Sequence, residues 1–432
     1  MLTTPKKFLN LFVGLILAAG LAGCGRTGAT TGPAAFKGKG GLAMVRNGNL
    51  FVLNGQDAGL HQLSTTGGVF NPKFSVDGRW ISFTNQAGVG NTGSPQLWLV
   101  RANGSGLHEV SGLPGPVWSN EYAWSRQTDR LAVAPHAQNG GIWLVPAEGR
   151  PTALKGINTA VSNLSWSPGG HRLAYVAPAS GLPNTEQGER SDGLYITTLN
   201  GDSATRTAQR YVIAGGGIIL AGWWPDGGGI LFWPDPLHSA SVAADGLGLE
   251  SLDLATGRLL ALGVTLVHKN WLTWSPTNIL YFISGAQREV WSNKEMVMAD
   301  VTLEKTQNLL LPSGSVYLSP ALSADGKHLA VVFGPVVGPK EHYPNMHTYA
   351  GQLSLGVANA DGTGFHALSG AGKGISSPVF TKDGKHIIFV RDNALWMISA
   401  SGAHPTRLAG LGPGFSNFYG YVDSEKYFAY HG

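Results

Sequence analysis

Cysteine is almost absent from this sequence, because Cys24 is the only one among 432 residues. A single cysteine excludes an internal disulfide and a cysteine-rich metal site. Charged residues are also scarce: they make up 13% of the chain, about half of the ~25% usual in soluble proteins. The formal net charge is +4, and the body of the chain has no cluster of lysine and arginine. We therefore expect no nucleic-acid partner.

Glycine and proline are abundant instead. The chain has 62 glycines and 24 prolines, and 43% of its residues are hydrophobic. The hydrophobic share argues against a disordered chain, because such chains are poor in apolar residues. The many turn formers argue against a helical bundle or coiled coil, which needs Ala, Glu, Lys and Leu at helical spacing. The composition predicts an all-β globular protein with many turns.

The N-terminus has the layout of a signal peptide. Lys6 and Lys7 precede a mostly apolar stretch over residues 8–21, which is shorter than the ~20 residues that span a bilayer. The ending Leu-Ala-Gly-Cys at 21–24 resembles the bacterial lipoprotein box, which implies cleavage before Cys24 and lipid attachment to its thiol. The alternative is an uncleaved helix with an incidental cysteine.

This leader sets the expected domain organisation and location. We predict a signal peptide over 1–23, a lipidated Cys24 and flexible tether over 24–41, and one folded domain over 42–432. Several acyl chains give stable membrane anchoring. The expected location is extracytoplasmic, anchored through acylated Cys24 to the bacterial cell membrane, or to the outer membrane if the envelope has two.

A segment that recurs about every 50 residues organises the rest of the chain. It consists of a bulky anchor residue, a turn of the Ser-x-Asp-Gly type, a basic residue and an apolar strand. Clear copies are NPKFSVDGRWISFTN (71–85) and NLSWSPGGHRLAYVAP (163–178). The anchor residues are Phe74, Trp124, Trp166, Trp223, Trp274, Leu322, Phe380 and Tyr421. We expect the tryptophans to be core residues between repeats.

A second motif follows each copy, with an apolar strand that ends in a glycine turn, as in LWLVRANGSGLHEVS (97–111). Each repeat therefore predicts four antiparallel strands, which is typical of a propeller blade. We predict an all-β propeller of eight blades. Seven is the alternative, if the irregular segment 274–321 is not a blade. Residues 42–73 lack strand one and 421–432 supply it, so the N- and C-terminal strands close the ring.

The copies WSPGGHRLAY (166–175) and SADGKHLAV (323–331) resemble the W-S-P-D-G-K repeats of TolB-like propellers, which are akin to WD repeats. The resemblance extends over most of residues 42–432, although Gly169 and Thr277 replace the usual Asp. It implies the propeller fold and a binding role. It assigns no substrate, since propellers host many functions.

Long loops point to one face of the predicted ring. Four long insertions all join strand two of a blade to strand three, namely 84–96, 177–193, 234–248 and 334–352. These 2–3 loops lie on the same face of the ring as the 4–1 loops, which join strand four of one blade to strand one of the next. Binding sites favour such loops, although a surface also tolerates insertions. The candidate binding residues in two loops are His342, Tyr343, His347, Tyr349, Trp233, Asp235 and His238.

A polar ring at the central opening is a further candidate site. Polar residues three or four positions before the anchors would form it, namely Asn71, Glu121, Asn163, Asn270 and Asn417. The alternative is that they simply end a loop. The sequence has no G-x-S-x-G elbow, H-E-x-x-H motif or P-loop, and we expect no metal or other cofactor.

These observations favour a lipid-anchored extracytoplasmic scaffold that binds a protein, peptide or glycan on the face of the 2–3 loops. The alternative is an extracytoplasmic propeller enzyme, a metal-dependent lyase or hydrolase that acts on a polysaccharide or peptide.

Overall fold

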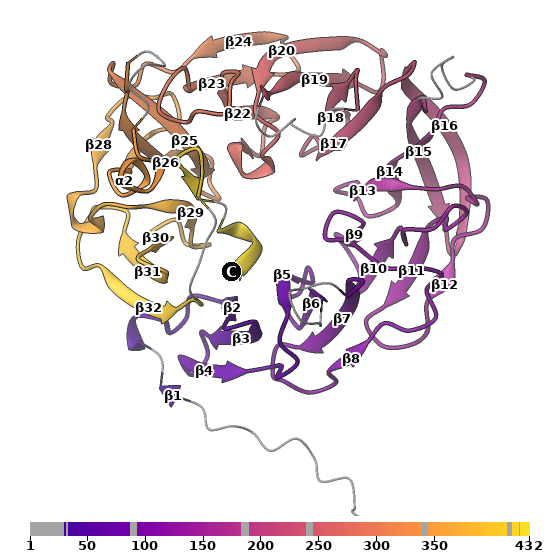
Figure 1. Cartoon of the computed structure of the whole chain (residues 1–432), viewed down its shortest axis with the longest axis horizontal. Coiled ribbons are helices and arrows are strands. Elements are labelled where there is room, and N and C mark those ends of the chain that lie inside the picture. Colours follow the sequence, from indigo (N-terminus) through magenta and orange to yellow (C-terminus); the bar gives the residue numbers. More distant parts are fainter. Residues whose placement is uncertain are drawn as a thin grey trace, which may run out of the picture.

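The computed structural model describes residues 30–31, 33–86, 93–182, 190–238, 245–338, 344–412, 417–422 and 424–432. Eight antiparallel sheets are arranged radially around one axis (Figure 1), each with the four strands of one blade. The predicted all-β propeller is confirmed, and the eight-blade count is right. Within the part of the chain that is described, no helix is long and apolar enough to cross a membrane.

The blades are numbered here from the N-terminus, and strand one of each blade lies nearest the axis (Figure 1). Blade 1 contains β35 (Phe428–His431), β2 (Gly41–Arg46), β3 (Asn49–Asn54), β4 (Gly59–Gln62) and the added edge strand β1 (Thr30–Thr31). Blade 2 contains β5 (Val69–Phe74), β6 (Trp80–Asn85), β7 (Gln96–Arg101) and β8 (His108–Glu109). Blade 3 contains β9 (Tyr122–Trp124), β10 (Arg130–Val133), β11 (Trp143–Pro146) and β12 (Thr152–Ala153). Blade 4 contains β13 (Ser162–Trp166), β14 (Arg172–Pro178), β15 (Asp192–Asn200) and β16 (Ser203–Ile213).

The second half of the ring follows the same order. Blade 5 contains β17 (Gly217–Trp223), β18 (Gly229–Asp235), β19 (Leu247–Asp253) and β20 (Leu259–Thr265). Blade 6 contains β21 (Leu272–Trp274), β22 (Ile279–Ser284), β23 (Glu295–Asp300) and β24 (Lys305–Asn308). Blade 7 contains β25 (Ser315–Leu322), β26 (His328–Pro335), β27 (Ser354–Asn359) and β28 (His366–Ala367). Blade 8 contains β29 (Ser376–Phe380), β30 (His386–Arg391), β31 (Ala394–Ser399) and β32 (Thr406–Gly410).

Short elements lie outside the blades. They are the hairpin β33 (Asn417–Phe418) and β34 (Tyr421–Val422), the helix α2 (Met346–Ala350), and the 3-10 turns η1 (Ala34–Phe36), η2 (Lys269–Trp271), η4 (Ser369–Ala371) and η5 (Glu425–Tyr427).

Both ends of the chain build blade 1, as predicted. β35 pairs antiparallel with β2, and Tyr430 lies opposite Leu42. In blade 4 the anchor Trp166 lies opposite Leu173 in the same way. Tyr430 therefore holds the anchor position of blade 1. The prediction of Tyr421 as that anchor is wrong, because Tyr421 lies in the separate β33–β34 hairpin.

Packing against the ring begins earlier in the sequence than residue 42. Phe36, which we had placed in the flexible tether, is fully buried in a cluster that contains Leu42, Met44 and Leu53. Thr30 and Thr31 pair with the outer strand β4. An aromatic side chain favours burial here because it removes a large apolar area from water.

The Asp-Gly turn between strands one and two is held by its own side chains. In blade 2 the Ser75 hydroxyl donates to Asp77 Oδ1 at 2.7 Å, and the Arg79 backbone N–H donates to the same oxygen at 2.9 Å. Gly78 has a φ of 71°, in the left-handed region that favours glycine. The recurring Ser-x-Asp-Gly sequence is thus the chemistry of one tight turn.

The tryptophan anchors bond one blade to the preceding one. The indole N–H of Trp166 donates to the carbonyl of Ala123 at 3.1 Å, and that of Trp223 donates to the carbonyl of Ser165 at 3.1 Å. Each acceptor directly precedes the anchor of the preceding blade. The basic residue after the turn adds to this contact, since Arg130 lies over the Trp166 ring. The prediction that these tryptophans are core residues between blades is confirmed for Trp124, Trp166 and Trp223, which are buried.

An ion pair joins the first and last blades, and it predicts a pH-dependent contribution to stability. Lys39 Nζ lies 2.7 Å from Asp383 Oδ2. Burial raises the pKa of Asp383, but the Lys39 ammonium and the Thr381 hydroxyl outweigh burial, so the pKa is below its ordinary value. A carboxylate whose pKa is lower in the folded than in the unfolded state stabilises the fold at pH values above its unfolded-state pKa of about 3.9. This stabilisation is lost as the pH falls through the folded-state pKa.

We therefore expect Asp383→Asn to lower Tm at pH 7 by about 1–3 °C, because a partly exposed ion pair contributes at most about 1 kcal/mol. The difference from the wild type should shrink between pH 4 and pH 2, as thermal unfolding monitored by circular dichroism would show. Asp325→Asn is the matched control, because Asp325 accepts from Ser323 in the equivalent turn of blade 7 and takes part in no ion pair found among the described residues. An equal loss in both variants would mean that the turn, and not the ion pair, is responsible.

Candidate functional site

The loop face of the ring, defined as the face with the 2–3 and 4–1 loops, carries an additional C-terminal layer. Instead of passing directly from β32 to β35, the chain forms β33, β34 and η5. In Figure 1 this yellow segment runs from the side of β25 and α2 inward to the centre of the ring. We call residues 417–422 and 424–427 the strap. The long connections at 236–246 and 336–353 lie between strands two and three, as predicted.

The strap is held by the 4–1 loop between blades 5 and 6 and by the inner strand of blade 8. Tyr421 packs against His268 and Trp271 at ring-centroid distances of 4.6 and 5.5 Å, and the Asn270 amide donates to its hydroxyl. Farther along, the Ser424 hydroxyl lies 2.8 Å from that of Ser377 in blade 8. The strap thus covers part of the loop face next to the axis.

A buried lysine organises the 2–3 loop of blade 6 beneath the strap. Lys294 is 1% exposed, and its ammonium donates to the carbonyls of Ala286, Gln287 and Ser292 at 2.9, 3.0 and 3.2 Å. Burial lowers the pKa of Lys294 to about 8, although Glu289 acts in the opposite direction. This loop presents Trp291, which packs against Tyr349.

The candidate residues of the blade 7 loop occupy different environments. His342 and Tyr343 lie outside the described residues. His347 is exposed on α2, whose first turn is capped by Asn345. Tyr349 is fully buried, and its hydroxyl donates to the Pro335 carbonyl at 2.9 Å. His347 therefore presents a side chain to solvent, whereas Tyr349 supports the loop from inside.

The candidate residues of blade 5 are also divided between core and surface. Trp233 is fully buried, and its indole N–H donates to the Thr265 hydroxyl at 2.8 Å. Asp235 is 5% exposed at the end of β18. His238 is exposed, and its Nε2 lies 2.8 Å from the Arg190 carbonyl, so it joins the loops of blades 4 and 5. Among the described residues, no group of three His, Cys, Asp or Glu side chains is arranged to hold a metal ion.

Asn71 and Asn163 have a conformational role in the inner strands. Their φ values are 52° and 49°, and each lies in a β-bulge where the register of strand one shifts. Asparagine tolerates this left-handed conformation better than most residues. Ser319 and Ser377 take the same place in blades 7 and 8, with φ values of 46° and 47°. The sequence pattern missed these two because serine was not counted as a member of the set.

The other candidate members of the polar ring do not share one environment. Glu121 is 6% exposed and accepts from the Trp118 backbone N–H at 2.8 Å, and burial raises its pKa. Asn270 lines a pocket of about 370 Å³ together with Ser319 and Ser377. The side chain of Asn417 lies outside what the structure describes. The structure thus brings Asn270 together with the two serines near the axis.

One lysine stands out in the inner strands. The eight strands nearest the axis contain no Asp or Glu, and Lys73 is their only Lys or Arg. Its ammonium donates to the Ser119 carbonyl at 2.6 Å and lies 4.1 Å from the centre of the Tyr122 ring. Burial, followed by the charge of Lys269, lowers the pKa of Lys73 to about 7. Lys73 bonds blade 2 to blade 3 and also lines a pocket of about 260 Å³.

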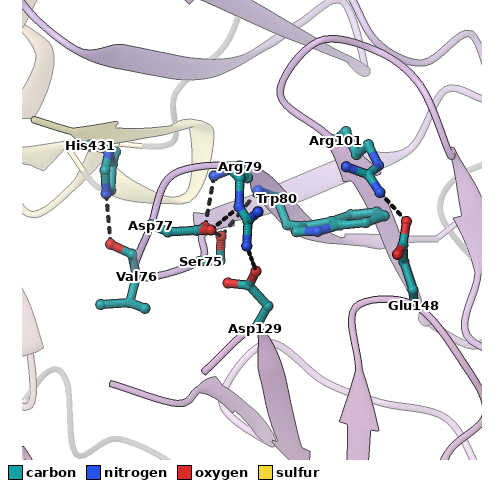
Figure 2. A network of polar contacts seen from close by, with 9 residues as sticks. All are labelled: Ser75, Val76, Asp77, Arg79, Trp80, Arg101, Asp129, Glu148 and His431. Atoms are coloured by element: carbon teal, nitrogen blue, oxygen red, sulfur yellow. Dashed lines mark hydrogen bonds and ion pairs between the residues drawn. The ribbon is translucent and has the colours of Figure 1, made fainter. Parts of the chain in front are cut away.

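The opposite face, which holds the 1–2 and 3–4 turns, has a larger groove between blades 1 and 2. We call it the seam groove. Its volume is about 500 Å³, and its lining includes Asn54, Phe74, Arg79, Arg101 and His431. Figure 2 shows Arg79 reaching from the Asp77 turn to Asp129 of blade 3, with 2.6 Å between Nη2 and Oδ2. Burial raises the pKa of Asp77, but the bonds from Ser75 and Arg79 outweigh it and lower the pKa to about 2.

A second arginine borders the same groove. The Arg101 guanidinium lies 4.7 Å from the centre of the Trp80 ring and bonds to Glu148 of blade 3 (Figure 2). Sequence reasoning missed the seam groove. Arg79 is recognisable as the basic residue of the repeat, but nothing local in the sequence places Arg101 or His431 beside it.

No protein-family model matches the chain, and no curated protein matches it. Solved structures with a similar fold include TolB from Acinetobacter baumannii, with 13% identity, 86% of this chain and 64% of that chain covered, and a TM-score of 0.36. Oligogalacturonate lyase from Vibrio parahaemolyticus has 10% identity over 84% of this chain and 94% of that one, with a TM-score of 0.47. A puromycin-hydrolyzing peptidase of Mycobacterium tuberculosis has 14% sequence identity. The match covers 79% of this chain and 53% of that chain, with a TM-score of 0.49.

This chain spans less than two thirds of the length of that TolB and of that peptidase. At identities of 10–14% these similarities concern the fold and select no activity. The strand topology therefore establishes what the chain is: an eight-bladed β-propeller with TolB among its structural neighbours.

Proposed function

We propose that this chain is a lipid-anchored, extracytoplasmic binding protein that recognises a protein or peptide partner through its loop face. The observation that carries the proposal is the distribution of exposed apolar side chains. Six of the eleven large apolar side chains that are exposed among the described residues lie in 2–3 or 4–1 loops, namely Trp118, Leu182, Leu237, Leu310, Val336 and Met346. The turns of the opposite face present only Val76 and Leu303 among those eleven.

Apolar side chains exposed on one face support a role in association, because water disfavours such surface. Leu310 is 89% exposed, Val336 is 49% exposed and Met346 is 38% exposed. The Val336 backbone N–H donates to the Gly314 carbonyl at 3.1 Å, which joins the blade 7 loop to the 4–1 loop that carries Leu310. We place the partner site in this sector, beside the strap.

The lipoprotein-like leader supports the location. An anchor at Cys24 followed by a short segment before Phe36 would hold the ring close to the membrane surface. A binding protein there meets partners at or near the same membrane.

Site-specific crosslinking in living cells tests the partner face. A photoreactive amino acid at position 310 or 346 should give a discrete adduct with one partner. The same residue at position 303 should not, since Leu303 is 63% exposed but lies in a 3–4 turn on the opposite face. Equal adducts from position 303, or none from positions 310 and 346, would contradict the proposal.

A further inference from the structure

The seam groove on the turn face holds hydrogen-bonding groups that the fold leaves unused. Asn54 Oδ1 accepts from the Gln56 backbone N–H at 2.9 Å, and Asn103 Oδ1 accepts from the Ser105 N–H at 3.0 Å. The Nδ2 groups of both side chains have no partner within the described residues. Two carboxamides at one groove thus have N–H donors available for a ligand.

His431 adds an acceptor to these donors. Its Nε2 lies 3.0 Å from the Val76 carbonyl, which can only accept, so the proton is on Nε2 in the neutral ring (Figure 2). The lone pair of Nδ1 is then free to accept a hydrogen bond. Arg79 and Arg101 also keep guanidinium N–H groups beyond those in their ion pairs.

Both arginines at the groove are already paired with carboxylates. Arg79 is paired with Asp77 and Asp129, and Arg101 is paired with Glu148. A carboxylate or phosphate ligand would therefore meet these acids as well as the arginines. A neutral ligand with both donors and acceptors matches the unused groups better.

Apart from Gln56, the remaining lining is apolar or glycine. Phe74 forms a wall at the inner end and lies 5.6 Å from the His431 ring. Gly38 lines the groove with a φ of 75°, and a Cβ atom there would meet nothing within 4 Å. The backbone is therefore open to close approach. The volume of about 500 Å³ falls in the range of small-molecule sites.

We propose that the seam groove binds a neutral saccharide. The vicinal hydroxyl groups of a sugar can accept hydrogen bonds from the carboxamide and guanidinium N–H groups and can donate one to the imidazole of His431. The C–H face of the sugar ring can pack on Phe74. This site is on the face opposite the partner surface proposed above and is independent of it.

Binding to immobilised oligosaccharides, followed by calorimetry, tests the site in the full-length chain purified in detergent. The panel contains neutral hexose and N-acetylhexosamine oligomers, their uronate and phosphorylated counterparts, and short peptides. We expect a neutral oligomer to bind. Gly38→Asn should weaken it by at least about tenfold, because asparagine tolerates this φ and fills the open space. Arg101→Met should weaken it to a similar degree.

Arg258→Met is the matched control, because Arg258 forms an equivalent ion pair with Glu304 between blades 5 and 6. It should leave saccharide affinity unchanged. Absence of binding to every neutral oligomer, preference for the charged probes or the peptides, or unchanged affinity in Gly38→Asn would each overturn the proposal. Thermal unfolding of Gly38→Asn verifies that the ring is intact.

Discussion

A chain that ends at Tyr427 should lose the closed ring. This truncation removes β35, which supplies four residue pairs to β2 and buries Phe428 in the apolar cluster between blades 1 and 8. It also removes Tyr430, whose hydroxyl donates to the Lys39 carbonyl at 2.7 Å. Blade 1 would keep only its outer strands and expose an unpaired edge. We expect Tm to fall by more than about 10 °C, or the chain to aggregate, as thermal unfolding and gel filtration would show.

A circular permutant separates closure from the loss of residues. Joining Gly432 to Pro33 by a short linker and opening the chain between β4 and β5 retains β35 and its pairing with β2. The permutant should stay monomeric, with a Tm within a few degrees of the parent. If the truncated chain has the same Tm as the wild type, the pairing of β35 with β2 does not stabilise the ring.

Cys24→Ser should abolish lipid anchoring almost completely. The lipoprotein-like box predicts that the Cys24 thiol is the acylated group, and serine has no thiol to modify. Several acyl chains bind far more tightly than a single chain, so their loss should move most of the protein out of the mature membrane-bound form. Cell fractionation and intact-mass measurement should then show an uncleaved precursor or released protein.

Gly25→Ser is the control for this change, since it alters the neighbouring residue and keeps the thiol. It should still give a mature, acylated chain that begins at Cys24. A Cys24→Ser protein that remains membrane-bound and has lost residues 1–23 would show that the anchor is elsewhere.

Local patterns predicted the blade well because a blade is a local structure. The anchors from Phe74 to Phe380 end strand one in seven blades, and an Asp-Gly turn follows the anchor in blades 2, 5, 7 and 8. Tyr421 misled the pattern because its surroundings resemble an anchor, although Tyr430 is the residue opposite Leu42. The two lie only nine residues apart, and only pairing with β2 distinguishes them.

The candidate sites were less predictable, for a physical reason that particular residues illustrate. The sequence suggested Trp233 as a binding residue because it is next to a long loop. In the structure it is buried, and its indole N–H donates to the Thr265 hydroxyl. Asn71 and Asn163 were candidates for polarity, whereas their backbone conformation accounts for them. The seam groove draws on β5, β7 and β35 together with the segment around Gly38, so no single repeat contains its pattern.

The amino-acid order alone therefore predicts the four-strand repeat, the strand order within each blade and the lipoprotein-like leader, since these depend on residues close together in the chain. It favours eight blades with seven as the alternative, and the pairing of β35 with β2 completes the eighth blade. Ring closure decided the rest. It brings Tyr430 to Lys39 across 391 positions and Asp383 to Lys39 across 344. It also places the strap over the loop face and opens the seam groove on the other. In a propeller, each blade contacts only its neighbours, so the surfaces between blades acquire their chemistry only when the ring is assembled.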